Sequence, residues 1–201
     1  MALHPPPRNL GRLVLQTKTV PISSLYRISG HASGEPYFGT AAANRFDDRT
    51  RARKARFGTC YCGFDIETAT AETLLHDELP KAGKFRLSNS LFESKHLVRF
   101  EGFDLVLADL TGVALKLVGG DGAISTTTPY ALPQLWAMNV HRHSQKVDGI
   151  YYVSRHLNDR FAVAVFSRAK SKFTDAKHTP LHSVFGVSSV ITTLGMNFPY
   201  P

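Results

Sequence analysis

The feature that most constrains the fold of this chain is a succession of short apolar segments with strand character. Only two further segments have helical character. The strand-like segments cover residues 24–29, 57–62, 96–100, 104–108, 149–153 and 160–166. Helical spacing of apolar residues covers 65–77 and 131–144. Because strands and helices do not alternate, the pattern predicts an α+β fold, and 201 residues fit a single domain with a sizeable core.

The segment 57–77 combines a strand and a helix. In the strand, the period of two places Cys60 and Cys62 on one face and Tyr61 on the other. Asp65 is a suitable N-cap for the helix that follows. Glu72 lies beside the inward stripe of this helix, which consists of Thr68, Ala71, Leu74 and Leu75. The unit therefore predicts a tyrosine and a carboxylate next to an apolar core.

The two ends and the cysteines suggest where the protein works. Residues 1–20 begin Pro-rich and are expected to form a loosely held arm before one domain over residues 21–201. No apolar run is long enough for a signal peptide or a membrane span. Cys60 and Cys62 are too close together for an unstrained disulfide. A disulfide-stabilised secreted domain is therefore disfavoured, and a cytoplasmic location is expected.

The charge is positive and unevenly distributed. Lys and Arg outnumber Asp and Glu by 24 to 16, which gives a formal charge of +8. Residues 45–56, RFDDRTRARKAR, hold six cations and two anions. Such a cluster attracts phosphate groups of nucleic acids or nucleotides, or an acidic partner protein, whereas the alternative is a solvated loop. A nucleic-acid-binding module is disfavoured because the cations fall in one loop without interleaved aromatic residues.

Metal and phosphate-loop sites are not expected. His141 and His143 are two residues apart on the second helix, which turns their side chains about 200° apart around its axis. The cysteine pair has no second pair to complete a zinc site. The GGDG stretch at residues 119–122 is a turn, since no GK[ST] follows it.

Five polar residues instead stand in apolar contexts: Arg27, Arg45, Tyr61, Glu72 and Ser154. Taken singly, each has a structural explanation, such as an ion pair for Arg27 or a helix-surface carboxylate for Glu72. Taken together, they suggest a polar site set into a core.

Four strings carry a resemblance to a known family: LYRIS, NRF, TCYCGFDIETATAETLLHD and DGIYYVSRH. They resemble the RES-domain family, which is named for its Arg, Glu and Ser and consists mostly of toxins from bacterial RES–Xre toxin–antitoxin pairs. The resemblance covers residues 24–168. Its strongest parts are Tyr61 followed eleven positions later by Glu72, and the stretch YVSR at 152–155. The long basic interval between Arg45 and Tyr61 departs from the family pattern.

The resemblance implies a fold similar to that of ADP-ribosyltransferase toxins, with two small β-sheets and a few helices around an NAD cleft. It implies NAD as substrate, degraded by hydrolysis or by phosphorolysis with inorganic phosphate as co-substrate, or ADP-ribosyl transfer to a protein. No prosthetic group and no metal are implied, and the partner is an Xre-type antitoxin. Arg45, Tyr61, Glu72 and Ser154 match the active-site positions of the family, and Arg27 is a further candidate.

These residue types suit the cleavage of the nicotinamide–ribose bond. The nicotinamide nitrogen is already cationic, so no general acid is needed, and the difficulty is an oxocarbenium-like transition state. Glu72 is expected to stabilise that charge. Arg27 and Arg45 suit the pyrophosphate. Tyr61 is expected to stack on the nicotinamide ring, and Ser154 to bond the carboxamide or a phosphate oxygen.

Overall fold

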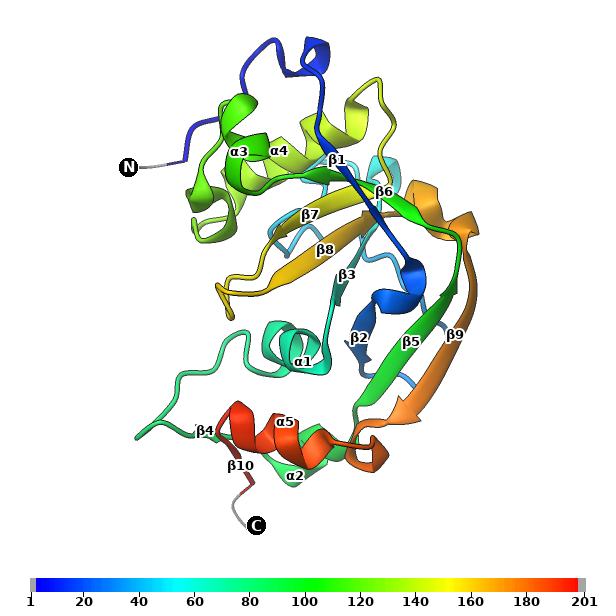
Figure 1. The fold of residues 1–201 in the computed structure, drawn as a ribbon, viewed down its shortest axis with the longest axis vertical. Helices are drawn as coiled ribbons and strands as arrows, with labels where there is room; N and C mark the ends of the chain where they lie inside the picture. Colours follow the sequence, from blue (N-terminus) through cyan, green and yellow to red (C-terminus); the bar gives the residue numbers. More distant parts are fainter. Residues whose placement is uncertain (1–2, 199–201) are drawn as a thin grey trace.

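The computed structural model describes residues 3–198 and shows a single α+β domain. Over these residues one large mixed β-sheet, one two-stranded sheet, five α-helices and several short 3-10 turns make up the fold (Figure 1). The predicted fold class is therefore confirmed. No helix in the described part of the chain is long and apolar enough to cross a membrane.

Eight strands form the large sheet, in the order β1 (Thr17–Val20), β6 (Leu105–Asp109), β7 (Gly149–Val153), β8 (Phe161–Phe166), β3 (Thr59–Gly63), β2 (Tyr26–Ser29), β5 (His96–Gly102) and β9 (Phe173–Pro180). The small sheet pairs β10 (Met196–Asn197) with β4 (Phe85–Arg86). The helices are α1 (Ile66–Leu74), α2 (Asn89–Glu93), α3 (Gly112–Leu117), α4 (Ala131–Arg142) and α5 (Val187–Thr193).

The large sheet is nearly divided where β3 meets β2. These two strands share one register pair, Tyr26 with Gly63, whereas β3 pairs with β8 over five residues. A five-strand part (β1, β6, β7, β8, β3) and a three-strand part (β2, β5, β9) therefore diverge from this junction, and α1 lies beside it (Figure 1). The cleft was expected to lie between two small sheets. This expectation is corrected, because the pair Tyr26–Gly63 joins the two parts into one eight-stranded sheet. The implied similarity to ADP-ribosyltransferase toxins stays a prediction.

One strand–helix–strand crossover is present, although the sequence showed no such alternation. Strands β6 and β7 are parallel neighbours, and the chain between them forms α3 and α4. The 39 residues 110–148 that separate the two strands hide the unit in the sequence, since only α4 has a clear helical period. The carboxyl ends of these strands lead into residues 110 and 154.

Helix α1 packs against the strands at the junction because its residues are small. Asp65 caps it as predicted, accepting a hydrogen bond from the backbone nitrogen of Thr68 at 2.6 Å. The predicted inward stripe, Thr68, Ala71, Leu74 and Leu75, is buried throughout. The close approach also requires Gly63, since a Cβ there would lie 2.8 Å from the backbone nitrogen of Ala69. The helix therefore presents its remaining face at a fixed place beside β3.

The N-terminal segment is packed against the domain, so the prediction of a loosely held arm is wrong for residues 3–20. Leu3, Leu10 and Leu15 are buried in the same core as α4. The Trp136 indole donates a hydrogen bond to the His4 carbonyl at 2.9 Å, and β1 pairs with β6. The three leucines and these backbone bonds outweigh the Pro-rich composition at the start of the chain.

Candidate active site

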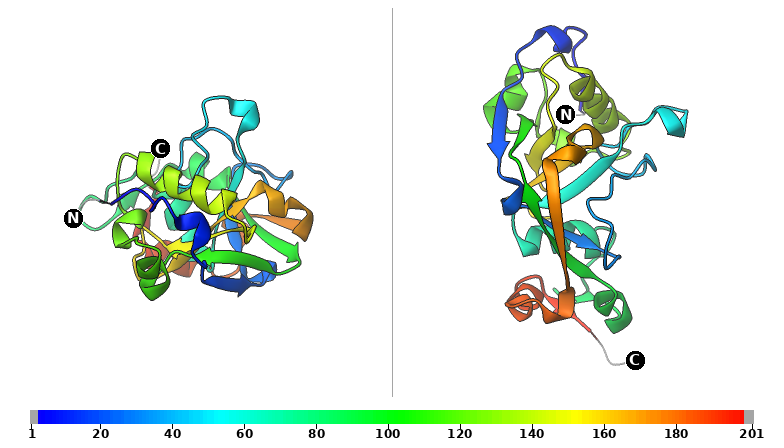
Figure 2. Two further views of the ribbon diagram at one scale, coloured as in Figure 1. Left: turned by 90° about the horizontal axis from the view of Figure 1, so that it is seen from above. Right: turned by 90° about the vertical axis from the view of Figure 1, so that its right-hand side faces the viewer.

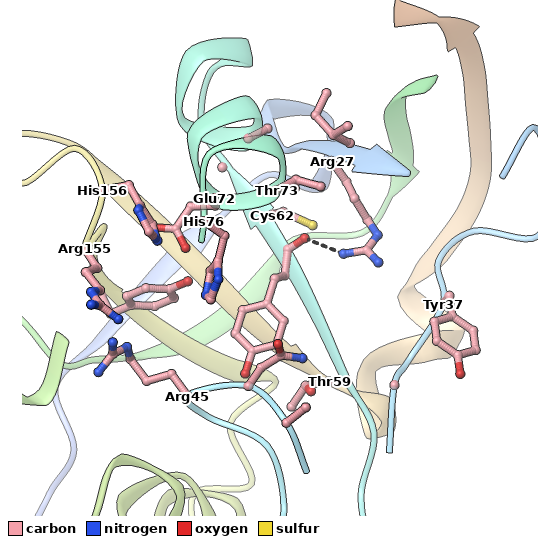
Figure 3. A pocket seen from close by; sticks show the side chains of 18 of the residues that line it. Arg27, Tyr37, Arg45, Thr59, Cys62, Glu72, Thr73, His76, Arg155 and His156 are labelled. Atoms are coloured by element: carbon pink, nitrogen blue, oxygen red, sulfur yellow. Dashed lines mark hydrogen bonds between the residues drawn. The ribbon is translucent and has the colours of Figure 1, made fainter. Parts of the chain in front are cut away.

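A cleft of about 670 Å³ opens where the two parts of the sheet diverge. Strands β2, β3 and β7, helix α1 and the loop before β3 all contribute to its walls. Four of the five residues predicted from the sequence line it, namely Arg27, Arg45, Tyr61 and Glu72. Figure 3 shows two groups of side chains at opposite ends of the cleft, which are named here the Glu72 end (Glu72, Arg45, Arg155, His76, His156) and the Arg27 end (Arg27, Tyr37).

Glu72 faces the cleft from α1 and is fixed by Ser154. The Ser154 hydroxyl donates a hydrogen bond to Glu72 Oε1 at 2.5 Å. The same hydroxyl oxygen accepts bonds from the backbone nitrogens of His156 and Leu157, both at 3.2 Å. Ser154 is 1% exposed. Ser154 therefore orients the Glu72 carboxylate, and its expected contact with substrate stays a prediction.

Arg45 is a buried cation with an unused donor. Its Nη1 donates to the carbonyl oxygens of Thr127 at 2.8 Å and Ile124 at 3.4 Å, and its guanidinium lies 4.6 Å from the ring centre of Tyr130. Its Nη2 is buried and has no hydrogen-bond partner among the described residues. Burial lowers the pKa of Arg45, and the positive charge of Arg155 lowers it further. Arginine nevertheless remains protonated in proteins, so this end of the cleft carries two guanidinium charges beside the Glu72 carboxylate.

The loop that carries Arg45 is held by buried acids. Asp47 Oδ2 accepts a bond from the Asn44 backbone nitrogen at 2.9 Å, and its Oδ1 accepts one from the Thr59 hydroxyl at 2.5 Å. Phe46 is fully buried and packs edge-on against Tyr152 with ring centres 4.8 Å apart. In the RFDD sequence, the residues that follow Arg45 are buried, and they thereby hold Arg45 in the cleft.

Tyr61 contributes its ring rather than its proton. Its hydroxyl donates to Asp47 Oδ1 at 3.0 Å and accepts from the Phe46 backbone nitrogen at 2.9 Å. Burial raises the pKa of Tyr61 well above its ordinary value, and the neighbouring Asp47 carboxylate raises it further. The phenol therefore stays neutral, while the ring lines the cleft, as expected for a stacking surface.

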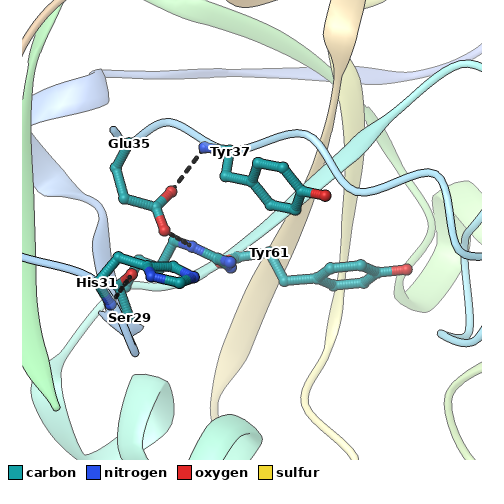
Figure 4. A network of polar contacts seen from close by, with 6 residues as sticks. Ser29, His31, Glu35, Tyr37 and Tyr61 are labelled. Atoms are coloured by element: carbon teal, nitrogen blue, oxygen red, sulfur yellow. Dashed lines mark hydrogen bonds and ion pairs between the residues drawn. The ribbon is translucent and has the colours of Figure 1, made fainter. Parts of the chain in front are cut away.

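Arg27 is paired with a carboxylate, unlike Arg45. Its Nε donates to Glu35 Oε1 at 3.0 Å and its Nη1 to the Tyr61 carbonyl at 3.0 Å. The other oxygen of Glu35 accepts from the Tyr37 backbone nitrogen at 2.7 Å (Figure 4). Burial opposes ionisation of Glu35, yet Arg27 and this amide outweigh it and hold the pKa of Glu35 below its ordinary value. The ion pair that the sequence analysis gave as a structural explanation for Arg27 is therefore present.

Among the cleft residues that were not predicted from the sequence, three belong to the Glu72 end. Arg155 and His156 directly follow Ser154, and His76 lies four residues after Glu72, in the turn that ends α1. Their proximity to two predicted site residues was the available signal. A residue next to a site serine lies near the same cleft. So does a residue one helical turn after a site carboxylate.

Three of the outer cations of the basic segment, Arg49, Arg53 and Arg56, donate hydrogen bonds to other parts of the described chain. Arg56 donates from Nε to the Thr50 carbonyl at 2.6 Å and from Nη1 to the Thr40 carbonyl at 2.9 Å. Arg49 donates to the Ala131 carbonyl at 3.1 Å. The loop tip, η3 (Arg53–Ala55), projects from the body of the molecule (Figure 2). The loop is therefore an ordered basic rim on the side of Arg45.

Over residues 3–198 no group of three or more His, Cys, Asp or Glu side chains is arranged to hold a metal ion. The side-chain groups that line the cleft include cationic nitrogens, tyrosine rings and the fixed Glu72 carboxylate. This arrangement suits a ligand with phosphate groups and a polar ring system, and a reaction in which positive charge develops next to Glu72.

Comparison with known proteins identifies the family of the chain. The sequence model of the RES domain matches residues 24–184. The chain belongs to the RES-domain family. The match includes both cleft ends and extends past the region 24–168 in which the resemblance was recognised. No curated protein matches the chain in sequence.

Among solved structures, the RES chain is similar to a chain of the "M.tuberculosis MbcT-MbcA toxin-antitoxin complex". The TM-score is 0.58, the sequence identity is 13%, and the match covers 94% of this chain and 98% of the other. At this identity the likeness concerns the fold.

Proposed function

We propose that this RES protein binds NAD in the cleft and cleaves its nicotinamide–ribose bond. The observation that carries the proposal is the Glu72 carboxylate, which a buried serine fixes at the end of the cleft that also contains Arg45 and Arg155. A cleft volume of about 670 Å³ lies within the range of ligand sites, roughly 300–1,000 Å³.

The residues divide the work of binding and catalysis. Arg45 offers Nη2 to a phosphate oxygen, for which a planar guanidinium is well suited. The Tyr61 ring, held by Asp47 at its far end, offers a rigid face for nicotinamide. Glu72 stabilises the oxocarbenium-like ribose as the bond to the cationic ring nitrogen breaks. The electron pair of that bond leaves with nicotinamide, so no general acid is required.

The proposal includes the biological role implied by the family. The protein acts as the toxin of a toxin–antitoxin pair in the cytoplasm, and an Xre-type antitoxin is its partner. The similar fold of a chain from a toxin–antitoxin complex supports this role. The basic rim at residues 49–56 supports a partner that presents acidic groups near the cleft.

The experiment is to incubate the purified protein with NAD, with and without inorganic phosphate, and to identify the products by mass. We expect nicotinamide in both cases, with ADP-ribose from attack by water or ADP-ribose carrying a phosphate at C1′ from attack by phosphate. A mass increase of an added protein by one ADP-ribose would instead assign the protein ADP-ribosyltransferase alternative. NAD that remains intact under all conditions would overturn the proposal.

A further inference from the structure

Two histidines stand together beside Glu72, and the chemistry described so far uses neither. The ring centres of His76 and His156 are 5.1 Å apart and the rings are tilted by 47°. Both side chains line the cleft, and Figure 3 shows them on either side of the Glu72 carboxylate. They come from different elements, since His76 follows α1 and His156 follows β7. The pair is therefore created by the fold and not by a sequence motif.

The backbone at His156 is held by the same serine that fixes Glu72. The Ser154 hydroxyl oxygen accepts a hydrogen bond from the His156 backbone nitrogen at 3.2 Å while the hydroxyl donates to Glu72. One serine thus holds both the Glu72 carboxylate and the backbone from which the His156 side chain extends. A general base that activates water and a carboxylate that stabilises the ribose cation must be held at a constant distance from each other, because both act at the same carbon atom.

The surroundings keep His156 neutral near physiological pH. Burial lowers the pKa of His156 below the ordinary value of 6.5. Glu72 on α1 raises that pKa, but His76 beyond α1, Arg155 on its own segment and Arg45 on the loop before β3 lower it. His156 is therefore available as a neutral proton acceptor, while the neighbouring His76 ring lies 2.9 Å through its Nδ1 from Asp77 Oδ1.

We propose that His156, assisted by His76, accepts the proton of an attacking water molecule and makes this protein an NAD hydrolase. The inference rests on the proposed function and assigns its nucleophile. The water oxygen forms a bond to ribose C1′, the C1′–nitrogen bond breaks with its electron pair leaving on nicotinamide, and the water proton passes to His156. Nicotinamide and ADP-ribose leave, and His156 then returns the proton to solvent.

Glu72 is poorly placed to be this base. Its Oε1 is held by the Ser154 hydroxyl, and its negative charge must persist while the ribose becomes cationic. A carboxylate that took up the water proton would lose that charge in the transition state. A separate neutral acceptor removes the conflict. Inorganic phosphate differs from water in this respect, because its dianion attacks without giving up a proton.

The difference between the two nucleophiles provides the test. NAD turnover is measured in phosphate-free buffer and in phosphate for the wild type, His156→Gln, His156→Asn, and His182→Gln as a matched control at an exposed histidine. We expect kcat for hydrolysis to fall about 100-fold in both His156 variants, as for loss of a general base. Turnover of NAD by phosphate should change little, and His182→Gln should match the wild type.

The pH profile tests the same assignment without removing His156. In the wild type, hydrolysis should fall as the pH decreases through the pKa of His156, below 6.5, because protonation removes the base. In His76→Gln the midpoint should move to higher pH, since the group that lowers the pKa of His156 is gone. A residue that only packs against its neighbour would not shift this midpoint.

Several results would overturn the assignment while leaving NAD cleavage intact. These are unchanged hydrolysis in both His156 variants, an equal loss with water and with phosphate, an unshifted midpoint in His76→Gln, or a wild type that consumes NAD only when phosphate is present. Melting temperatures of all variants identify a loss that comes from misfolding. Absence of NAD turnover by the wild type in either buffer would overturn the proposed function, and the role of His156 with it.

Discussion

Each end of the cleft contains an arginine, and the two arginines differ in whether a carboxylate is paired with the guanidinium. At the Arg27 end, the guanidinium is paired with Glu35, whose side chain is 2% exposed. At the Glu72 end, the Arg45 guanidinium contacts only carbonyl oxygens and the Tyr130 ring, and its Nη2 has no partner among the described residues. One cation is therefore neutralised within the protein, while the other has charge available for a ligand.

This difference separates two roles that the sequence could not distinguish. A buried donor without a partner costs free energy in the unliganded protein, about 1–3 kcal/mol, and more when the group is charged. A bound anion removes that cost. We therefore expect Arg45 to contribute mainly to substrate binding and Arg27 mainly to the fold.

The largest effect on catalysis is expected at Glu72. Glu72→Gln keeps the shape of the side chain and an acceptor for the Ser154 hydroxyl, but it removes the negative charge. We expect kcat for NAD to fall by about two orders of magnitude or more, as for loss of one strong transition-state contact. Glu67→Gln, on the same helix and outside the cleft, is the matched control. A folded Glu72→Gln variant with turnover close to the wild type would remove this carboxylate from the mechanism.

A smaller effect, mainly on substrate binding, is expected at Arg45. Arg45→Lys retains a positive charge but cannot reach a phosphate and the Thr127 carbonyl with one planar group. We expect KM for NAD to rise about tenfold with a smaller change in kcat, because Arg45 binds ground state and transition state alike. Arg51→Lys, at an exposed position of the same segment, controls for the substitution. Steady-state constants for both variants that match the wild type would contradict the distinction between the two arginines.

Ser154→Ala tests whether the serine acts through Glu72. The variant frees Glu72 Oε1 and leaves the carboxylate charge in place. We expect kcat to fall about tenfold, corresponding to roughly 1.4 kcal/mol, while KM stays close to the wild type. A raised KM with unchanged kcat would instead show that the serine contacts substrate, as the sequence suggested.

The smallest effect on turnover is expected at Arg27, where the fold should suffer. Arg27→Met leaves the Glu35 carboxylate buried without its partner, and we expect a loss of about 3 kcal/mol in the free energy of unfolding measured with urea. Because the folded-state pKa of Glu35 is lowered, the pairing stabilises the protein above the ordinary value of 4.5 and is lost as the pH falls through the lowered pKa. The stability gap between wild type and variant should therefore be full at neutral pH and close in acid. A gap that does not depend on pH would contradict the ion-pair account.

The strand–helix unit that carries Tyr61 and Glu72 could be predicted from local patterns. The alternation around Tyr61, the Asp65 cap and the apolar stripe of α1 all depend on neighbours within a few residues, and the structure confirms each. The fully buried residues of β7 and β8 were likewise evident as apolar runs.

Other elements were hidden because their stabilising contacts are distant in sequence. Strands β1 and β9 lie at the two edges of the sheet and are largely exposed or half-buried, so they show no apolar alternation. Helix α5 has the sequence VSSVITT, whose β-branched residues favour a strand. It is helical in a place where its Val187 and Ile191 pack into a core. The pairing of Ser154 with Glu72 spans 82 residues, and no local pattern could reveal it.

The most direct test of the account is a crystal structure of Glu72→Gln with NAD bound. The account predicts intact NAD in the cleft, with ribose C1′ beside the side chain of residue 72, nicotinamide against the Tyr61 ring and a phosphate oxygen on Arg45 Nη2. NAD bound outside the cleft, or inside it with the ribose away from residue 72 and no phosphate contact to Arg45, would contradict the account.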